Sequence, residues 1–420
     1  MIHAPRGVED ILPSKAFWYS WIEKEAGGLF SLYGYQEVRI PTFERTELFL
    51  RSVGEETDVG KQMYTFEDKG GRSISLRPEG TAGVARAYIE HKLYGKKKPW
   101  KVYYAGPMFR YEKPQAGRLR EFYQIGVECF GEESPLLDVE IIQMAYYFLN
   151  KLGLNDTEIQ INSIGCKDCR GEYIKQLKFY LKDRIDSLCE VCKRRFESNP
   201  LRILDCKNVV CKNVLEKAPQ IEDFLCSSCK EHFDSVKKEL DRLKVFYVLN
   251  PYLVRGLDYY TRTIFEIKSS HLGSQDTICA GGRYDDLVSE LGGPPTPAMG
   301  FAIGLERLLL SLEKAGVKPS IACLPCIFVI GIGQACIQEG MRLASLIRSQ
   351  GIPAIVNFAN KSLSAQLRQA DKEGFPWVLI VGEKEVEEKR YILRNMKSGR
   401  QLYVNEKDFK ILDKILKGES

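Results

Sequence analysis

The chain has 420 residues, of which 44% are hydrophobic and 28% charged, which is typical of a soluble protein with two or three domains. No apolar run approaches the ~20 residues of a membrane helix, and the N-terminal MIHAPRGVEDILP has acidic residues where a signal peptide is apolar. A net charge of +5 permits nucleic-acid binding without identifying it. We expect a cytoplasmic protein with no membrane contact, whose 13 cysteines are thiols or metal ligands.

The first predicted elements are a helix over residues 17–32 and a strand over residues 35–40. Apolar residues recur at helical spacing in the first, and Pro41 stops the second. By periodicity alone, both elements are scaffold.

A turn with the sequence SLRPEGT, residues 75–81, precedes a second predicted helix. Thr81 is placed to cap that helix, because the residues after it show an apolar helical face. Glu79 lies in the Pro-Glu-Gly turn just before the helix, where it is either a solvated turn residue or a ligand-binding carboxylate.

Residues 102–131, VYYAGPMFRYEKPQAGRLREFYQIGVECFG, predict two strands joined by a polar loop. Alternate side chains of a strand share one face, and in the second strand one face is ordinary core. The other face carries Arg120, Phe122, Gln124, Gly126 and Glu128. Such a polar row is typical of a ligand site, with a solvated edge hairpin as the alternative. Gly126 favours a closely approaching ligand, since an exposed strand face does not require a missing side chain.

The stretch FRYEKPQAGRLREFYQIGVE resembles the second signature motif of class II aminoacyl-tRNA synthetases, in the form found in the histidyl-tRNA synthetase family. That form has an arginine after a phenylalanine, here Arg110, and a strand ending in Q-x-x-x-E, here Gln124 to Glu128. The first helix and strand, with Pro41, are similar to the first class II motif, which implies that they form the interface of a homodimer.

Residues 166–245 form a segment that is rich in cysteine, lysine and glutamate. Closely spaced pairs recur among Cys166, Cys169, Cys189, Cys192, Cys206, Cys211, Cys226 and Cys229. Two C-x-x-C pairs about 15–20 residues apart indicate structural zinc, and eight thiols could make two four-cysteine sites. The alternative is free thiols in a helical insertion, because members of the family are not zinc enzymes as a rule. The family does have an insertion here, which reaches towards the acceptor arm of the tRNA.

Arg255, Tyr259 and Tyr260 lie in the stretch LVRGLDYYTRTIFE, residues 253–266, which leads into a predicted strand. This stretch resembles the motif that distinguishes histidyl-tRNA synthetases from other class II enzymes. Without that resemblance, the three residues would be surface and core. The glycines of the following GGRYD, residues 281–285, allow the backbone to pass close to a ligand.

Arg307 falls in the first turn of a helix predicted from residue 305, after a short strand over residues 298–303. The helix macrodipole disfavours a cation at this position unless an anion is also there. The sequence GLER at residues 304–307 resembles the third class II motif, whose arginine holds the γ-phosphate of ATP.

Beyond residue 325, predicted strands and helices alternate, as in a small α/β unit. Its first strand lacks a glycine-rich phosphate loop, because Gly331 and Gly333 have no third glycine after them. The layout is similar to the anticodon-binding domain of the histidyl, glycyl, threonyl and prolyl enzymes.

The resemblance therefore covers nearly the whole chain. It implies a class II catalytic domain over residues 1–323, of α+β type on an antiparallel sheet, interrupted by a helical cysteine-rich insertion over residues 166–245. It also implies a C-terminal α/β anticodon-binding domain over residues 324–420.

The activity implied is that of a histidine–tRNA ligase. Such an enzyme joins L-histidine to ATP with Mg²⁺ to form histidyl-adenylate, then transfers histidine to the terminal adenosine of tRNA(His). The carboxylate of histidine is ionised at neutral pH, so the first step needs positioned cations rather than a general base. Arg110, Arg255 and Arg307 are the expected catalytic residues.

The expected site residues fall into three groups. The histidine-binding residues are Glu79, Thr81, Arg110, Gln124, Glu128, Arg255, Tyr259 and Tyr260. The ATP-binding residues are Arg110, Glu112, Arg118, Phe122 and Arg307. Lys113 and Gln115 are expected to contact tRNA, although a solvated loop is the alternative. Among the first group, Glu79 and Gln124 would bind the ammonium and carboxylate groups of histidine. Glu128 and the two tyrosines would form hydrogen bonds with the nitrogens of its ring.

Two other classes of protein stay open. One is the synthetase-like regulatory subunit of ATP phosphoribosyltransferase, which lacks the anticodon domain and usually loses the catalytic arginines that this chain keeps. The other is a zinc-dependent nucleic-acid-binding protein built on the insertion, which would leave Arg255 and Arg307 unexplained.

Overall fold

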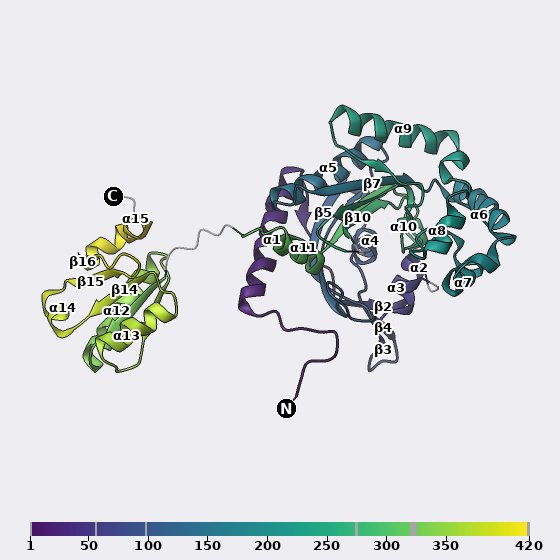
Figure 1. Cartoon of the computed structure of the whole chain (residues 1–420). Helices are drawn as coiled ribbons and strands as arrows, with labels where there is room; N and C mark the ends of the chain where they lie inside the picture. Colours follow the sequence, from purple (N-terminus) through teal and green to yellow (C-terminus); the bar gives the residue numbers. More distant parts are fainter. Residues whose placement is uncertain (1, 55–56, 97–98, 274–275, 320–325, 418–420) are drawn as a thin grey trace. The chain divides into compact units, whose positions relative to one another are not determined.

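A computed structural model of the chain describes residues 2–54, 57–96, 99–273, 276–319 and 326–417. The chain divides into two compact units, Met1–Pro319 and Ser320–Ser420, each with its own hydrophobic core (Figure 1). The domain boundary predicted at residues 323 and 324 lies within 320–325, outside the described residues.

The larger unit is built on an eight-stranded sheet with the order β1-β5-β6-β11-β10-β9-β7-β8. Its neighbouring strands are antiparallel except at the two edges, where β1 pairs with β5 and β8 pairs with β7 in parallel. Its strands are β1 (Gln36–Glu37), β5 (Trp100–Phe109), β6 (Glu121–Phe130), β7 (Thr157–Ser163), β8 (Val248–Leu249), β9 (Thr261–Ser269), β10 (Thr277–Arg283) and β11 (Ala298–Gly304). A small antiparallel sheet contains β2 (Phe43–Arg45), β3 (Thr65–Glu67) and β4 (Ser73–Leu76).

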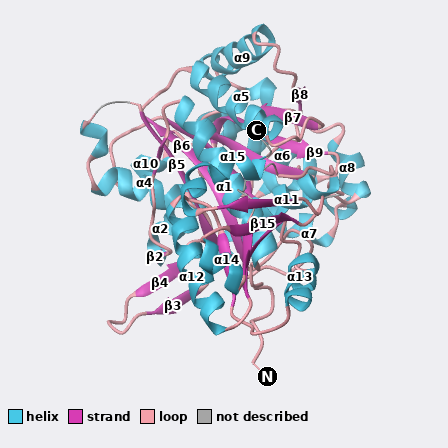
Figure 2. Cartoon of the chain, turned by 90° about the vertical axis from the view of Figure 1, so that its left-hand side faces the viewer, coloured by secondary structure: helices cyan, strands magenta, loops and turns pink. Residues whose placement is uncertain are grey.

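Helices cover both faces of the large sheet. One face packs against α1 (Pro13–Leu32), α5 (Pro135–Lys151), α9 (Ser227–Arg242) and α11 (Leu305–Lys314), and α5 lies beside α9 (Figure 2). The other face packs against α2 (Thr46–Val53), α3 (Asp58–Lys61), α4 (Thr81–Glu90), α10 (Leu287–Glu290) and the helices of the insertion other than α9. Ile125, Val127 and Cys129 enter the first core, as the alternation along β6 predicts.

The predicted insertion, residues 166–245, contains helices and no strand. Its helices are α6 (Lys167–Lys182), α7 (Glu190–Ser198), α8 (Val209–Leu215) and α9, joined by short 3-10 turns. The α+β class, the antiparallel sheet and the helical character of the insertion are therefore confirmed. The strand predicted over residues 35–40 shrinks to β1, because this segment lies at the sheet edge and pairs on one side alone with β5.

The smaller unit is an α/β domain whose five-stranded sheet has the order β13-β12-β14-β15-β16. Its elements are β12 (Ile327–Gly331), α12 (Gln334–Ser349), β13 (Ala354–Asn357), α13 (Leu363–Lys372), β14 (Trp377–Val381), α14 (Glu383–Glu388), β15 (Tyr391–Asn395), β16 (Gln401–Val404) and α15 (Leu412–Lys417). The predicted alternation is confirmed. Gly331 serves packing here, since a Cβ on it would lie 2.5 Å from the backbone nitrogen of Ile337 in α12.

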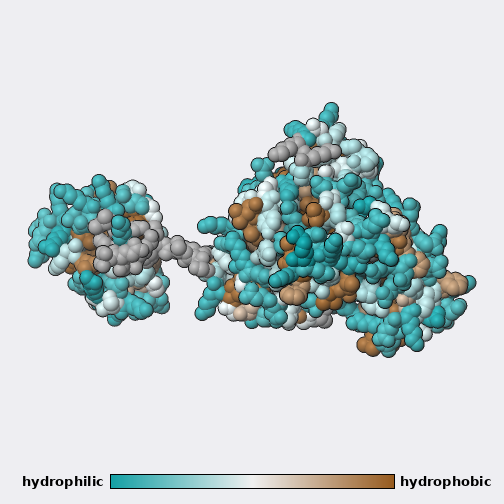
Figure 3. Space-filling model, turned by 90° about the horizontal axis from the view of Figure 1, so that it is seen from above, coloured by the Kyte–Doolittle hydropathy of each residue, from teal (hydrophilic) through white to brown (hydrophobic). Residues whose placement is uncertain are grey.

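No helix among the described residues is both long and apolar enough to cross a membrane. Hydrophilic side chains cover most of the surface seen in Figure 3, and the hydrophobic patches on it are small and separate.

Gly126 makes room for a residue of the protein itself, which corrects the prediction that a ligand fills this space. Tyr104 lies opposite Gly126 on β5 and is buried. A Cβ on Gly126 would lie 2.2 Å from Cζ of the Tyr104 ring, and a Cβ on Gly80 would come equally close on its other side, also at 2.2 Å. The two glycines thus form the slot that holds this ring.

We expect Gly126→Ala to destabilise the larger unit by about 1–3 kcal/mol, because the added methyl group overpacks the slot. Gly171→Ala is the matched control: Gly171 is exposed in α6, a Cβ added there would have nothing within 4 Å, and a helical alanine should be neutral or stabilising. Urea unfolding of both variants measures the difference, and equal midpoints would contradict the assigned role of Gly126.

Candidate active site

A cavity of about 450 Å³ lies where β6, β9, β10 and β11 meet the loop before β9 and the start of α4. It collects the residues predicted from separate stretches of the sequence to bind histidine and ATP, with the exception of Glu128. Those lining it are Glu79, Thr81, Arg110, Glu112, Arg118, Phe122, Gln124, Arg255, Tyr259, Tyr260 and Arg307. Lys113 and Gln115 lie outside it, exposed in the loop between β5 and β6.

Glu79 closes the N-terminus of α4. Its carboxylate accepts hydrogen bonds from the backbone N–H groups of Thr81 (2.6 Å) and Ala82 (2.9 Å), so Glu79 does the capping that the sequence predicted for Thr81. Glu79 is 4% exposed and is therefore not a solvated turn residue. Burial raises its pKa, while the two N–H groups and the nearby Arg110 oppose that shift.

Arg110 follows β5 and is held against the same turn. Its Nε donates to the carbonyl oxygen of Pro78 at 2.8 Å, and its guanidinium lies 5.3 Å from the centre of the Phe122 ring. Burial lowers the pKa of Arg110, but an arginine stays charged at neutral pH. The turn before α4 and the hairpin therefore fix one cation beside one carboxylate.

Glu128 lies behind the cavity wall. It accepts hydrogen bonds from the Thr81 hydroxyl at 2.6 Å and from the Tyr284 hydroxyl, and a Cβ on Gly300 would collide with it, at 2.0 Å from Oε2. Burial raises the pKa of Glu128 to about 8. Sequence reasoning missed Tyr284, which lines the cavity; its signal was the tyrosine of GGRYD.

The glycines of GGRYD, Gly281 and Gly282, were expected to admit a ligand. A Cβ on Gly281 would lie 2.3 Å from the carbonyl oxygen of Gly300, and one on Gly282 would lie 2.6 Å from that of Thr263. These glycines allow β10 to pack closely between its two neighbouring strands, so that expectation was wrong.

Arg255 projects from the loop before β9 and forms an ion pair with Glu266 on that strand. Burial opposes the charged form, but Glu266, Tyr260 and Tyr259 together outweigh it and the pKa of Arg255 is raised. The Arg255 Nε is buried and has no hydrogen-bond partner among the described residues. Tyr259 and Tyr260 follow with ring centres 4.8 Å apart. Glu266 was missed as a site residue, although it ends the motif that contains Arg255.

Arg307 enters the cavity from the first turn of α11, and its Nη1 donates to the carbonyl oxygen of Thr277 at 2.9 Å. Burial and the nearby charge of Arg118 lower its pKa. Arg118 in turn pairs with Glu112 at 3.2 Å. Two guanidinium groups that repel each other beside a helix N-terminus provide a site suited to an anion.

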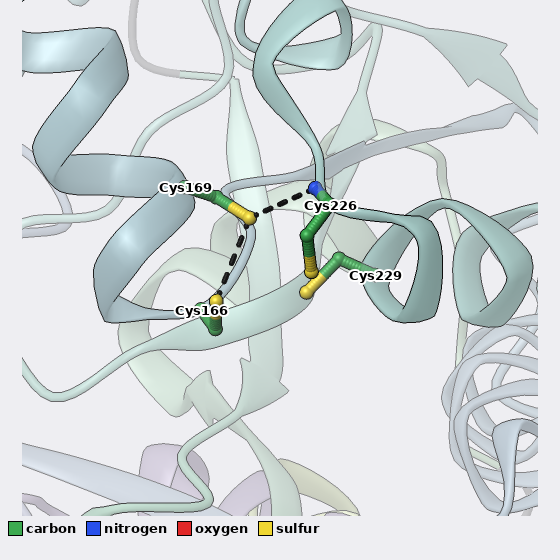
Figure 4. A group of neighbouring side chains, drawn as sticks. All are labelled: Cys166, Cys169, Cys226 and Cys229. Atoms are coloured by element: carbon green, nitrogen blue, oxygen red, sulfur yellow. Dashed lines mark hydrogen bonds between the residues drawn. The ribbon is translucent and has the colours of Figure 1, made fainter.

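The eight cysteines of the insertion form two groups of four. The outer group is Cys166, Cys169, Cys226 and Cys229, and the inner group is Cys189, Cys192, Cys206 and Cys211. Within each group the sulfur atoms lie within 4.8 Å of one another, and the cysteines are free thiols. Figure 4 shows the outer group converging from the N-terminal ends of α6 and α9.

The spacing of the sulfur atoms fits a tetrahedral metal site. Four thiolates at ~2.3 Å from a zinc ion lie roughly 3.8 Å apart. The Sγ atoms of Cys166 and Cys169 are 3.5 Å apart, and those of Cys189 and Cys206 are 3.8 Å apart. A backbone N–H also points at a sulfur in each group, from Cys226 to Cys169 at 3.1 Å and from Cys189 to Cys211 at 3.2 Å.

A largely antiparallel sheet of this order, with one arginine in the β5–β6 hairpin and another at the start of α11 after β11, defines a class II aminoacyl-tRNA synthetase fold. A family model described as histidyl-tRNA synthetase matches residues 7–169 and 182–308, and one described as anticodon binding domain matches residues 326–415. The chain belongs to the histidyl-tRNA synthetase family.

Similar proteins extend along the whole chain. A histidine–tRNA ligase of Halothermothrix orenii is 48% identical over 404 residues, 96% of each protein, and one of Thermodesulfovibrio yellowstonii is 50% identical over 398 residues, 94% of each. The crystal structure of apo S. aureus histidyl-tRNA synthetase has a TM-score of 0.82 at 37% identity and covers 100% of this chain and 99% of that one. These matches favour the ligase over the regulatory subunit and over the nucleic-acid-binding alternative.

The raised pKa of Glu128 gives a pH-dependent contribution to stability. The folded protein keeps this proton up to about pH 8, whereas the unfolded chain loses it near ~4.3. Between these values the folded state binds the extra proton, so the free energy of unfolding falls as pH rises, by up to about 1.4 kcal/mol per unit.

Glu128→Gln should remove this part of the pH dependence, which urea unfolding of ligand-free protein from about pH 6 to about pH 9 can measure. The difference between the two proteins should change with pH below about pH 8 and level off above it. A difference independent of pH across the range would show that Glu128 is ionised throughout.

Proposed function

We propose that the cavity is where this histidine–tRNA ligase joins L-histidine to ATP. The observation that carries the proposal is the convergence of Arg110, Arg255 and Arg307 on one cavity that also contains the buried carboxylate of Glu79. In adenylate formation the histidine carboxylate attacks the α-phosphate and pyrophosphate leaves. The oxygens around that phosphorus gain negative charge, which fixed cations stabilise best in a site that excludes water.

The amino acid would lie between α4 and the loop before β9. Glu79 is the proposed counter-ion of the ammonium group, and Gln124, whose buried Oε1 has no partner among the described residues, bonds to the same end. Tyr259 and Tyr260 face the imidazole. Glu128 takes part in histidine binding through Thr81 and Tyr284, the two cavity residues whose hydroxyl groups it accepts from.

The nucleotide would occupy the side of the cavity formed by Phe122, Arg118 and Arg307, with the adenine on the Phe122 ring. Arg307 and Arg118 are proposed to bind the outer phosphates. Glu112 and Glu266 line the same cavity and supply oxygen ligands of the kind that Mg²⁺ takes. The bound ion would neutralise charge on the phosphates.

In the second step the histidyl group would pass to the terminal adenosine of tRNA(His). Lys113 and Gln115, exposed in the loop between β5 and β6, are the proposed contacts with the acceptor end. The unit of residues 324–420 is the proposed anticodon-binding domain, after the catalytic domain of residues 1–323. We further propose that the protein acts as a cytoplasmic homodimer through α1, β1 and Pro41.

The two cysteine groups are the second part of the proposal: each binds one zinc ion. Eight thiols arranged in two compact groups of four, with N–H groups directed at sulfur, have the ligand number and spacing of four-cysteine zinc sites. The zinc would have a structural role, since four protein ligands leave no open coordination position.

Arg255→Ala should lower kcat of histidine-dependent pyrophosphate exchange by ~100- to 1000-fold and change the KM for histidine far less, because its guanidinium acts on charge that develops in the transition state. Arg255→Lys should recover little activity, since a point charge cannot bridge Glu266 and two anions as a planar fork does. Histidine-dependent pyrophosphate exchange by the wild-type protein is the result expected from the function proposed for the cavity. Exchange within about threefold of wild type in both variants would remove Arg255 from the catalytic residues.

Protein purified under reducing conditions without chelator should contain two zinc ions per chain, one for each four-cysteine group. Cys166→Ser and Cys206→Ser should each lose one ion, whereas Cys336→Ser, in the smaller unit and outside both groups, should keep two. Metal analysis by plasma mass spectrometry gives the count. Absence of metal from a folded wild-type protein would refute the zinc sites.

A further inference from the structure

We infer that the cysteine-rich insertion positions the histidine-binding loop, residues 253–260, through Arg170, Asn199 and Arg202. Metal in the insertion would then set the affinity of the enzyme for histidine. The inference rests on the proposed function of the cavity and of the two cysteine groups. It adds a positioning role for residues that do not touch the reacting atoms.

The histidine-binding loop needs support from outside itself. It contains no helix or strand, and β9 begins only at Thr261. Its inner side contributes Arg255, Tyr259 and Tyr260 to the cavity. A segment without its own backbone ladder keeps such side chains in place only if other elements bind its polar groups.

Arg170 connects the outer cysteine group to the end of the loop. It follows Cys169 directly on α6, and its Nη1 donates to the carbonyl oxygens of Asp258 at 3.2 Å and Tyr260 at 2.9 Å. The backbone reinforces this connection, because Gly165, next to Cys166, accepts a hydrogen bond from the N–H of Arg262 at 2.8 Å. The residue next to a metal ligand is thus one hydrogen bond away from the tyrosine pair.

The inner cysteine group reaches the middle of the loop. Asn199 donates to the Asp258 carboxylate of the loop at 3.2 Å. Arg202 is held beside the loop by an ion pair with Asp58 of α3 at 3.3 Å. The Arg202 guanidinium lies over Gly256, where a Cβ would come within 3.6 Å of it. Arg202 itself lines the cavity, as do both sequence neighbours of the metal ligand Cys206.

The three residues that make these contacts all lie next to, or between, the cysteines proposed to bind metal. Asn199 and Arg202 lie in the stretch between Cys192 and Cys206, and Arg170 lies in the first turn of α6, directly after the outer pair Cys166 and Cys169. A zinc ion in each group would fix the ends of these segments, and through them the outer side of the loop. Loss of the metal should therefore loosen Tyr259 and Tyr260 before it affects the ATP side of the cavity.

Arg170→Ala tests this connection by removing both hydrogen bonds from the loop. The KM for histidine in pyrophosphate exchange should rise about tenfold, while the KM for ATP and kcat stay within about threefold of wild type. Arg170→Lys should restore much of the affinity, because its ammonium can still donate to a carbonyl. Amide hydrogen exchange of residues 253–260 should be faster in Arg170→Ala.

Lys175→Ala is the control on the same helix, since Lys175 is exposed and pairs with Glu172 within α6. It should behave as wild type. A lower kcat in Arg170→Ala with an unchanged KM for histidine would indicate a smaller active fraction and would overturn the positioning role.

Removal of metal from the wild-type enzyme by a chelator completes the test. It should raise the KM for histidine as Arg170→Ala does. An unchanged KM after the zinc is gone would refute control by metal and leave the zinc sites standing. If the purified wild-type protein contains no metal, the zinc sites are refuted. A raised KM for histidine in Arg170→Ala would in that case still support the contacts between the insertion and the loop.

Discussion

The cavity depends on the burial of charged groups in pairs. A lone guanidinium or carboxylate inside a protein costs several kcal/mol, so each one here has an opposite charge or a dipole beside it. Glu79 caps α4 close to Arg110, Arg255 faces Glu266, and Arg118 pairs with Glu112. Each pair keeps its cation charged and in place. The cavity between the pairs still presents both positive and negative groups. Histidine and ATP, with charges of both signs, would complete that arrangement.

The alternation along β6 gives the sheet its two different faces. Ile125, Val127 and Cys129 join a core made with α1, α5 and α11, whereas Phe122 and Gln124 face the cavity. One strand therefore packs into the scaffold with one face and contributes side chains to the site with the other.

Much of this could be predicted because it is local. Period-2 alternation identified β6, helical spacing identified α11, and the closely spaced cysteine pairs identified the cysteines that cluster in space. Motifs far apart in the sequence proved to line one cavity, apart from Glu128, which lies behind it. What failed was the interpretation of glycines: Gly126 and Gly281 make room for Tyr104 and for a neighbouring backbone. A sequence shows that a side chain is missing but not which atoms occupy the space.

The partners of the charged groups also could not be predicted from the sequence. Nothing in the motif around Arg255 shows that Glu266 faces it across the start of β9, or that Tyr284 binds Glu128. The grouping of the eight cysteines could not be predicted for the same reason. Their spacing identifies candidate ligands, but only the fold determines which pairs meet.

The pairing of the cysteines is nested: the inner group lies wholly between the two halves of the outer one along the chain. The inner cysteines are closer to one another in sequence and emerge from the ribosome before Cys226 and Cys229 do. Closing the inner group first shortens the free chain between the outer pairs, which lowers the entropy lost when these meet. The insertion can therefore assemble from its centre outwards, with each closure making the next one easier.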